Sequence, residues 1–456
     1  MTIELDKNKI AKLAEEQEAI LDANTQKSKK MFESAVHLSN GVASSYQSRD
    51  PWPIYIDRGS GPKIWDVDGN EYWDFHNGYG AMVQGHGHPA IGEALAERWP
   101  KGSHFGSATE DDLVVSDLLS QRFGLAKWRF TNSGSEATMD AIRIARAFTG
   151  RDTVMKIFGS YHGHHDTVMV SAVVTDQDMG PRFHYRQLPY GGGIPATTVW
   201  NTVPVPFNDA EAMERRIEEL NAEDRLPACV IMEAAMMNLG VVFPEPGYLE
   251  AVREITKKWG IVLIFDEVKT GLCIAAGGAT EKFGVTPDMV TLAKALGGGL
   301  PSGAIGGTEE VMRVVEDHTV YQVGTYSGNP LSMAAARASL EKVLTPQAYQ
   351  HLDHLNDRIV KGCDAVLKKY DVAGYTVGIG SKGCVTFADH KIVDFESYIK
   401  NQNVGITELA WLWNMNHGIF MTPGREEEWT LSVTHTDEAI DAYVNALDSL
   451  LAEVTK

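Results

Sequence analysis

Cysteine is scarce in this sequence. Only four cysteines occur among 456 residues: Cys229, Cys273, Cys363 and Cys384. They lie too far apart to form a C-x-x-C redox pair or any paired-cysteine metal motif. We therefore expect reduced thiols buried in the core.

Long apolar runs and an excess of basic residues are also missing. No run approaches the roughly 20 residues of a membrane helix, and charged residues stand near the N-terminus where a signal peptide would be apolar. The 61 acidic and 41 basic residues give a net charge of −20, which would repel nucleic-acid phosphates and anionic membranes. We expect a cytoplasmic protein whose partners are small molecules, not nucleic acid or membrane.

The length and composition predict more than one domain. A chain of 456 residues with 43% hydrophobic residues exceeds what one ordinary domain holds. We divide it into residues 1–75, an N-terminal arm with a small antiparallel sheet that packs on the small domain, residues 76–335, a large domain, and residues 336–456, a C-terminal small domain.

The N-terminal arm is predicted from two different periodicities. Residues 3–38 carry apolar residues on a rough 3.6-residue period without Gly or Pro, which predicts a helical stretch. Three short extended runs follow at 54–56, 63–66 and 72–75, separated by glycine turns. These runs predict the small antiparallel sheet.

The middle of the chain alternates apolar runs with helical stretches, which is typical of a mostly parallel sheet covered by helices. The predicted strands are 128–131, 153–158, 229–232, 261–265, 289–292 and 304–306, and a helix over 248–259 ends at Gly260. Helices at 331–344, 347–370 and 436–454, with short strands, predict a smaller α+β domain after it. The fold class is therefore α/β.

The strongest chemical feature is an aspartate and a lysine that each follow a predicted strand. Asp266 ends the run Ile264-Phe265-Asp266, and Lys294 comes 28 residues later. Ligands of open α/β sheets bind at the carboxyl ends of strands. Pyridoxal 5′-phosphate requires a lysine for a Schiff base and an acid near its ring nitrogen, although an isolated pair of this kind would also suit a salt bridge at a sheet edge.

Three further segments fit the same chemistry. The segment 132–137, Asn-Ser-Gly-Ser-Glu-Ala, stands between a strand and a helix, where free N–H groups bind phosphate or a serine simply caps the helix. Tyr161 follows a strand and could stack on a flat ring. The histidines after it lack the spacing of a metal site, so we expect no metal. The polar loop 324–330 could bind phosphate or only turn the chain.

In sequence order, these blocks resemble the class III pyridoxal-phosphate aminotransferases of fold type I, in the branch that includes glutamate-1-semialdehyde aminomutase. The resemblance runs from about Phe32 to the C-terminus. Its blocks are 65–70 (Trp-Asp-Val-Asp-Gly-Asn), 85–89 (Gly-His-Gly-His-Pro), the phosphate segment, 161–163 (Tyr-His-Gly), 266–268 (Asp-Glu-Val) and 294–299, which begins at the lysine.

The resemblance implies roles for individual residues. Lys294 would carry the cofactor and act as the catalytic base, and Asp266 would hold the proton on the ring nitrogen. The other implied cofactor contacts are Ser133, Gly134 and Ser135 at the phosphate, Tyr161 and Val268 on the two ring faces, Glu233 and Asn238 near the ring, and Thr325 on the phosphate of the neighbouring subunit. A homodimer with an active site shared between subunits is implied as well.

Two positions depart from the family pattern. Lys269 stands where many relatives have Gln or Met, and we expect its side chain to point to solvent or to form a salt bridge. Gln47 replaces the arginine that the aminomutase pattern uses to hold a substrate carboxylate. The second departure weakens the aminomutase hypothesis.

The leading functional hypothesis is an aminotransferase that acts between an amine or amino acid, including β-amino acids, and a keto acid or aldehyde. The alternatives are an aminomutase or epimerase, and a catalytically silent module that binds the cofactor. For substrate contacts the candidates are Tyr79, Arg49, Trp52 and Arg425. Arg425 could hold a carboxylate in two parallel hydrogen bonds or pair with the glutamates that follow it.

Overall fold

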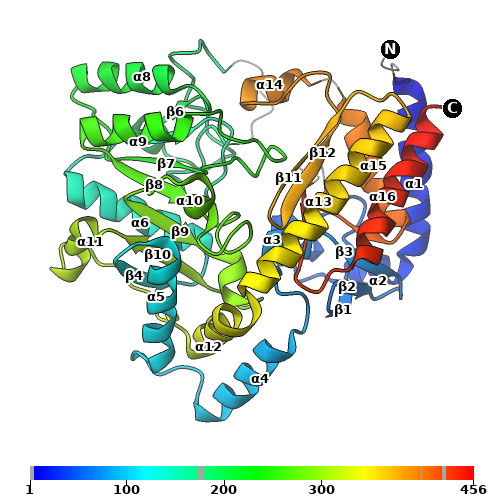
Figure 1. Cartoon of the computed structure of the whole chain (residues 1–456), viewed down its shortest axis with the longest axis horizontal. Helices are drawn as coiled ribbons and strands as arrows, with labels where there is room; N and C mark the ends of the chain where they lie inside the picture. The colour runs from blue at the N-terminus through cyan, green and yellow to red at the C-terminus, as the bar shows by residue number, and fades with distance from the viewer. Residues whose placement is uncertain (1–4, 173–178, 402, 424–427) are drawn as a thin grey trace.

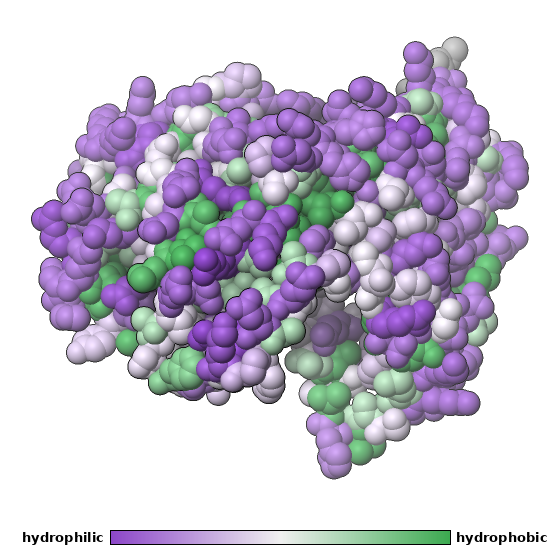
Figure 2. Space-filling view, turned by 60° about the horizontal axis from the view of Figure 1, so that its bottom comes forward, coloured by the Kyte–Doolittle hydropathy of each residue, from purple (hydrophilic) through white to green (hydrophobic). Residues whose placement is uncertain are grey.

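Two lobes make up the computed structural model, which describes residues 5–172, 179–401, 403–423 and 428–456. Figure 1 shows the main sheet and its helices in one lobe, and both chain ends in the other. The face shown in Figure 2 is mainly hydrophilic, with hydrophobic residues gathered across its middle. In the described part of the chain, no helix combines the length and apolar character needed to cross a membrane.

The large lobe is built on a seven-stranded sheet of order β4-β10-β9-β8-β7-β5-β6. Its strands are β4 (Lys127–Thr131), β5 (Val154–Ile157), β6 (Thr202–Val205), β7 (Cys229–Met232), β8 (Val262–Asp266), β9 (Met289–Leu292) and β10 (Gly303–Gly307). Only β10 runs antiparallel to its neighbours. The predicted mostly parallel sheet is thus confirmed, but sequence analysis missed β6, a four-residue strand that contains Pro204. A proline argues against a central strand, and β6 lies at the edge of the sheet, where proline is tolerated.

Helices cover both faces of this sheet, as the alternation along β8 shows. Val262 and Ile264 share one buried cluster with residues of α6 (Gly134–Thr149) and α11 (Glu309–Glu316). Leu263 and Phe265 belong to the other cluster, together with residues of α5 (Glu110–Phe123), α8 (Ala210–Ala222), α9 (Tyr248–Trp259) and α12 (Pro330–Ala338). Successive side chains of a strand point to opposite faces, so each face of the sheet has its own core.

Glycine ends the helix that precedes β8, as the sequence predicted. Gly260 has φ of 57°, and its N–H donates to carbonyls in the last turn of α9. This left-handed conformation is easily adopted only by glycine. It turns the chain directly into β8, whose carboxyl end carries Asp266.

The smaller lobe combines both ends of the chain. It contains β11 (Tyr375–Ile379), β12 (Lys382–Thr386) and β14 (Glu428–Thr430) in one antiparallel sheet, with α13 (Pro346–Lys369) and α16 (Asp437–Val454). A second sheet has the order β1-β2-β3-β13, formed by β1 (Ile56–Ser60), β2 (Lys63–Asp66), β3 (Glu71–Asp74) and β13 (Ile419–Phe420). Because β13 pairs with β3, the N-terminal sheet is joined to the C-terminal region.

The predicted N-terminal helix is in fact two helices, α1 (Lys7–Asn24) and α2 (Gln26–Ser34). Thr25 between them is not helical. Its hydroxyl accepts a hydrogen bond from Trp52 Nε1 at 3.1 Å, and the carboxylate of Asp68 accepts from the backbone N–H groups of Lys27 and Ser28. These contacts with distant residues cap a new helix, which local periodicity does not reveal.

The remaining helices connect these units. They are α3 (Asn77–Gly80), α4 (Pro89–Arg98), α7 (Ala196–Asn201), α10 (Gly278–Phe283), α14 (Phe395–Lys400) and α15 (Val404–Asn416), with 3₁₀ turns at Ser39–Gly41, Ser45–Gln47, Trp99–Lys101 and Lys294–Gly297. The predicted helix 331–344 corresponds to α12 followed by a π-helical turn, Ser339–Val343.

Candidate active site

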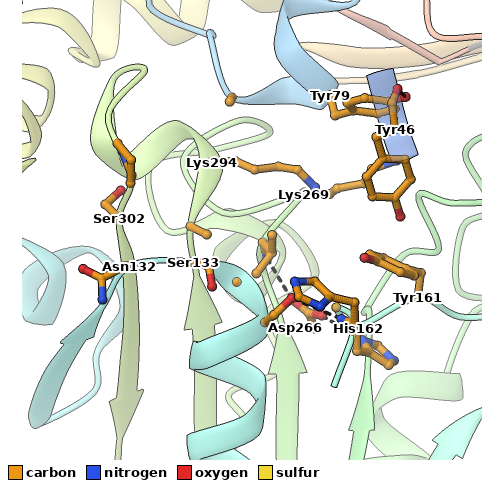
Figure 3. Close-up of a pocket in the computed structure, with 18 of the residues that line it drawn as sticks. Tyr46, Tyr79, Asn132, Ser133, Tyr161, His162, Asp266, Lys269, Lys294 and Ser302 are labelled. Atoms are coloured by element: carbon orange, nitrogen blue, oxygen red, sulfur yellow. Dashed lines mark hydrogen bonds and ion pairs between the residues drawn. The ribbon is translucent and has the colours of Figure 1, made fainter. Parts of the chain in front are cut away.

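The carboxyl ends of five strands meet at one pocket of 560 Å³, shown in Figure 3. Ser133 follows β4, Tyr161 follows β5, Glu233 follows β7, Asp266 ends β8 and Lys294 follows β9. Residues far apart in sequence are brought together because parallel strands end at the same edge of the sheet. The volume suits a small organic ligand.

Asp266 lies at the floor of this pocket and is held by three hydrogen bonds. Its Oδ1 accepts from the backbone N–H of Val268 at 3.0 Å and from the hydroxyl of Thr291 at 3.1 Å. Its Oδ2 lies 2.7 Å from Nδ1 of His162. The side chain is also buried. Its carboxylate is therefore held in one position, as it must be if it is to contact a single atom of a cofactor ring.

His162 is a site residue that the sequence analysis did not select. Burial lowers the pKa of His162, although the charge of Asp266 opposes that shift. Its Nε2 is buried without a hydrogen-bond partner among the described residues. The clue in the sequence was its position next to Tyr161, but the histidines of this segment were weighed only as metal ligands, for which their spacing is unsuitable. Among the described residues, no group of three or more metal-ligating side chains lies together.

Lys294 starts the turn after β9 and is a half-buried amine of the pocket. Its φ of 42° is a left-handed conformation, which is costly for a residue with a side chain and typical of functional sites. Burial lowers the pKa of Lys294 to about 8, and the charges of Lys269 and Lys382 act in the same direction. A lysine that loses its proton near neutral pH is suited to bind an aldehyde or to accept a proton.

Lys269 also lines the pocket, and it is paired. Its Nζ lies 3.1 Å from Oε2 of Glu428 and donates to the carbonyl of Met237 at 2.5 Å. The expected salt bridge is thus present. The alternative that Lys269 points to solvent is wrong, because only 8% of its side chain is exposed.

The N-terminus of α6 forms another end of the pocket and offers hydrogen-bond donors there. Ser133 caps the helix by accepting from Glu136 N–H at 3.2 Å, and Ser135 Oγ accepts from His164 N–H at 3.1 Å. At Gly134, a Cβ atom would lie 3.0 Å from Val268, so a larger residue would crowd the pocket. The helix N-terminus favours an anion here.

Two polar residues at the same pocket were not selected from the sequence. Asn132 precedes the helix, and its backbone N–H donates to the carboxylate of Glu136 at 2.7 Å. Ser302 stands before β10, and its buried hydroxyl has no partner within the described residues. Because β10 is antiparallel to β9, its amino end faces the same edge of the sheet as the carboxyl end of β9. This reversal could not be read from the apolar pattern.

Glu233 and Asn238 form a polar pair in the wall of the pocket. The amide of Asn238 donates to Oε2 of Glu233 at 3.2 Å. Burial raises the pKa of Glu233 to about 8, and the charge of Asp266 adds to that shift. Glu233 is therefore largely protonated at neutral pH and can itself donate a hydrogen bond.

Three tyrosines form the aromatic side of the pocket. The ring of Tyr46 lies 5.1 Å from that of Tyr79 and 6.0 Å from that of Tyr161. The hydroxyl of Tyr79 donates to the carbonyl of Tyr46 at 3.0 Å. Figure 3 shows Tyr161 and Tyr46 opposite the serine end of the pocket. This side can take an apolar or aromatic group.

Other candidates from the sequence lie elsewhere. Arg49 pairs with Asp22 at 2.9 Å, and Trp52 is buried against Thr25, so the structure brings neither side chain to the pocket. Thr325 is exposed on the loop before α12. Arg425 lies outside the described residues.

The residues present fit pyridoxal 5′-phosphate. The pocket combines an anion-binding helix end, a buried carboxylate, a lysine with a lowered pKa, and Gly134, where a Cβ atom would crowd Val268. The unpartnered hydroxyl of Ser302 adds a polar atom that a ligand could satisfy. These are the parts that bind the phosphate, the ring nitrogen and the aldehyde carbon of this cofactor.

Comparison with known proteins agrees with this fit. Residues 44–423 match the family model described as Aminotransferase class-III. The chain is 38% identical over 429 residues to "Glutamate-1-semialdehyde 2,1-aminomutase 2" of Brevibacillus brevis, covering 93% of this chain and 97% of that protein.

Two solved structures are similar along nearly the whole chain. An omega-transaminase from Sphaerobacter thermophilus has a TM-score of 0.89 at 34% identity, covering 94% of this chain and 98% of that one. A glutamate-1-semialdehyde aminomutase from Pseudomonas aeruginosa, solved in complex with PMP, has a TM-score of 0.90 at 26% identity, covering 99% and 100%. The α/β fold is therefore fold type I, the cofactor is pyridoxal 5′-phosphate, and the chain belongs to the class III aminotransferase family.

Proposed function

We propose that this enzyme is an aminotransferase that moves an amino group from an amine or amino acid, including β-amino acids, to a keto acid or aldehyde. Pyridoxal 5′-phosphate, when bound, supplies the aldehyde that accepts the amino group and a ring that takes up electrons. Lys294 would hold the cofactor and, once replaced by the substrate amine, would move the proton at the substrate carbon. Asp266, fixed by His162 and Thr291, would keep the proton on the ring nitrogen.

Gln47 is the observation that carries this choice over an aminomutase. Its side-chain oxygen accepts hydrogen bonds from the backbone N–H groups of Ala43 and Ser44, at 3.1 and 3.2 Å. The side chain is thus bound to its own turn and is not directed at a substrate. Among the described residues that line the pocket, none is an arginine. A substrate carboxylate placed as the aminomutase pattern implies would therefore lack the arginine expected to hold it.

The tyrosines support a donor with an apolar or aromatic substituent. Tyr46, Tyr79 and Tyr161 place three rings along one side of the pocket. Aromatic pairs stabilise by about 1 kcal/mol beyond the area they bury. We infer that donors with an aryl group react faster than their small aliphatic counterparts.

The test is whether turnover requires a separate amino acceptor. Each donor of a panel of amines, α-amino acids and β-amino acids is incubated with the enzyme, with and without pyruvate or 2-oxoglutarate. We expect one equivalent of donor to be deaminated without an acceptor, and continued turnover only with one. Turnover of a single substrate with its amino group retained in the product would contradict the proposal.

An aminomutase is the second candidate, because the curated relative from Brevibacillus brevis is named as one and matches 93% of this chain. Glutamate-1-semialdehyde alone, without an acceptor, would then be converted catalytically. A third outcome, cofactor binding without deamination of any donor, would favour a silent binding module.

We also propose a homodimer in which Thr325 contacts the phosphate in the partner's pocket. Thr325 lies outside the pocket of its own chain and within a loop whose apolar side chains are largely exposed. Tyr321, Val323 and Tyr326 are 74%, 75% and 60% exposed. Exposed apolar residues that gather in one segment favour burial against a partner.

A further inference from the structure

Three charged side chains are buried together where the small lobe meets the pocket. Nζ of Lys269 lies 3.1 Å from Oε2 of Glu428, and Nζ of Lys382 lies 2.6 Å from Oε1 of the same carboxylate. Lys382 also donates to the hydroxyl of Thr430 at 2.7 Å. Lys269 belongs to the large lobe, whereas Lys382 and Glu428 lie on β12 and β14 of the small lobe. We refer to Lys269, Lys382 and Glu428 as the lysine–glutamate cluster.

The charges of this cluster do not cancel. The two lysines lower the pKa of Glu428 against the effect of burial, so that its carboxylate stays ionised. Two ammonium groups and one carboxylate leave one positive charge. The exposed fractions of the three side chains are only 8%, 0% and 4%, so solvent screens this charge weakly.

The positive charge of this cluster acts on Lys294, the proposed catalytic amine. Lys269 and Lys294 line the same pocket, and Figure 3 shows their side chains at the same end of it. Burial is the largest cause of the lowered pKa of Lys294, and Lys269 and Lys382 come next. Glu428 and Asp266 act in the opposite direction. Cys273, which also lies near Lys294, is kept as a thiol because burial raises its pKa.

We propose that the lysine–glutamate cluster is a charge-setting device that raises the fraction of Lys294 present as the free amine whenever Lys294 is not attached to the cofactor. Only the free amine has the electron pair that forms a C–N bond to an aldehyde carbon, with the aldehyde oxygen leaving as water that takes both amine hydrogens. The same electron pair accepts the substrate proton. The inference rests on the proposed role of Lys294 and assigns a function to Lys269.

The experiment measures the protonation of Lys294 directly. The full-length protein is freed of cofactor, its fold is checked by circular dichroism, and it is treated with acetic anhydride at a series of pH values. Mass spectrometry of the Lys294 peptide gives the rate of acetylation, whose midpoint in pH reports the pKa of that amine. The rate at which added pyridoxal 5′-phosphate reattaches provides a second readout on the same variants.

The variants are chosen so that charge and shape make different predictions. Lys269→Met and Lys382→Met each remove one positive charge, and we expect the Lys294 midpoint to rise by about one pH unit. At pH 7 the acetylation and reattachment rates should then fall about tenfold. Glu428→Gln removes the negative charge and should lower the midpoint. Lys269→Arg retains the charge and should leave the midpoint near that of the wild type.

Lys382→Met is the most informative variant, because Lys382 does not line the pocket and its loss removes no side chain from the pocket wall. Lys258→Met is the matched control. Lys258 is an exposed surface lysine paired with Glu214 at 2.7 Å, and its loss should not move the midpoint.

Two results would overturn the inference. One is an unchanged Lys294 midpoint in both folded lysine variants, and the other is a shift in the same direction in all three charge variants, which would indicate general loosening. If Glu428→Gln does not fold, the two lysine variants decide the matter. If the midpoints shift as expected but no donor is deaminated with any acceptor, the proposed transferase activity fails while the charge-setting role stands.

Discussion

Nδ1 of His162 lies 2.7 Å from Oδ2 of Asp266, with both side chains buried. The histidine thereby fixes the orientation of the acid that is proposed to protonate the cofactor ring. Because Thr138 donates to the carbonyl of His162 at 2.6 Å, the histidine is itself held by the helix that forms the phosphate end. Hydrogen bonds through His162 therefore link Asp266 to helix α6 at the phosphate end of the pocket.

Replacing His162 should lower catalytic activity without unfolding the protein. We expect His162→Phe to lower kcat/KM by roughly 10- to 100-fold, since a hydrogen bond to a charged group contributes about 1.5 to 3 kcal/mol. Steady-state kinetics and the affinity for pyridoxal 5′-phosphate would both be measured. His184→Gln, at an exposed position, is the control. Equal activity of the two variants would show that Asp266 needs no support from His162.

Lys294, not Lys269, is expected to carry the cofactor. Lys269 Nζ is already bonded to Met237 and Glu428, whereas the pKa of Lys294 is lowered to about 8 by burial. Borohydride treatment of the yellow holoenzyme should attach the cofactor to the Lys294 peptide alone, as peptide mapping would show. Lys294→Ala should abolish turnover while circular dichroism stays unchanged. Label on Lys269 would reverse the assignment.

Much of this site could be predicted from sequence because its residues follow strands. Asp266 ends β8, whereas Ser133, Tyr161 and Lys294 follow strands β4, β5 and β9, and strand ends of a parallel sheet converge. The same reasoning predicted a mostly parallel sheet covered by helices. A local pattern was sufficient for these residues because each lies at the carboxyl end of a parallel strand.

The remaining residues depend on contacts that no local pattern encodes. From the small lobe, Glu428 pairs with Lys269 of the pocket wall and Lys382 pairs with Glu428, so their role depends on how the two lobes pack. The N-terminal helix is interrupted at Thr25, which accepts a hydrogen bond from Trp52, while Asp68 accepts one from the N–H of Ser28. Arg49 resembled a substrate ligand in the sequence, but Asp22 of α1 neutralises it.

Glu233 should make stability depend on pH. Its pKa is raised from 4.5 to about 8, mainly by burial, so the folded state keeps a proton that the unfolded state releases. The stabilising effect is complete below pH 4.5 and is lost as the pH rises to 8. Relative to Glu233→Gln, the wild type should lose a free energy of unfolding on the order of a few kcal/mol across this range.

Urea unfolding of both proteins at several pH values measures this difference. Glu218→Gln, at an exposed position of α8, is the matched control and should follow the wild type. Parallel curves for the wild type and Glu233→Gln would mean that Glu233 is ionised in the folded protein.

The exposed loop before α12 should form part of a dimer interface. Tyr326 is 60% exposed, and a charge there would oppose burial against a second chain. We expect light scattering to give a dimer for the wild type and a monomer for Tyr326→Glu, with weaker cofactor binding because Thr325 would lose its partner's phosphate. Trp200→Glu is the control, since Trp200 is similarly exposed but stacks on Arg225 at 3.8 Å. A wild-type monomer that binds the cofactor fully would contradict the shared site.

Arg425 is the last candidate for a substrate carboxylate, because Gln47 is bound to its own turn and Arg49 is bound to Asp22. Its neighbours in sequence are turn-forming residues and the glutamates 426–428, of which Glu428 is already paired with Lys269 and Lys382. Surface pairing with Glu426 or Glu427 is the alternative role. The two roles differ in kinetics. A guanidinium that holds a carboxylate in two hydrogen bonds acts only on substrates that have one. We expect Arg425→Ala to lower kcat/KM for pyruvate or 2-oxoglutarate by roughly 30- to 150-fold, equivalent to about 2 to 3 kcal/mol, and to leave a carboxylate-free amine donor nearly unaffected. Arg49→Ala serves as the matched control and should not separate the two substrates. An equal effect of Arg425→Ala on acid and amine, or none on either, would assign Arg425 to surface pairing with its glutamates.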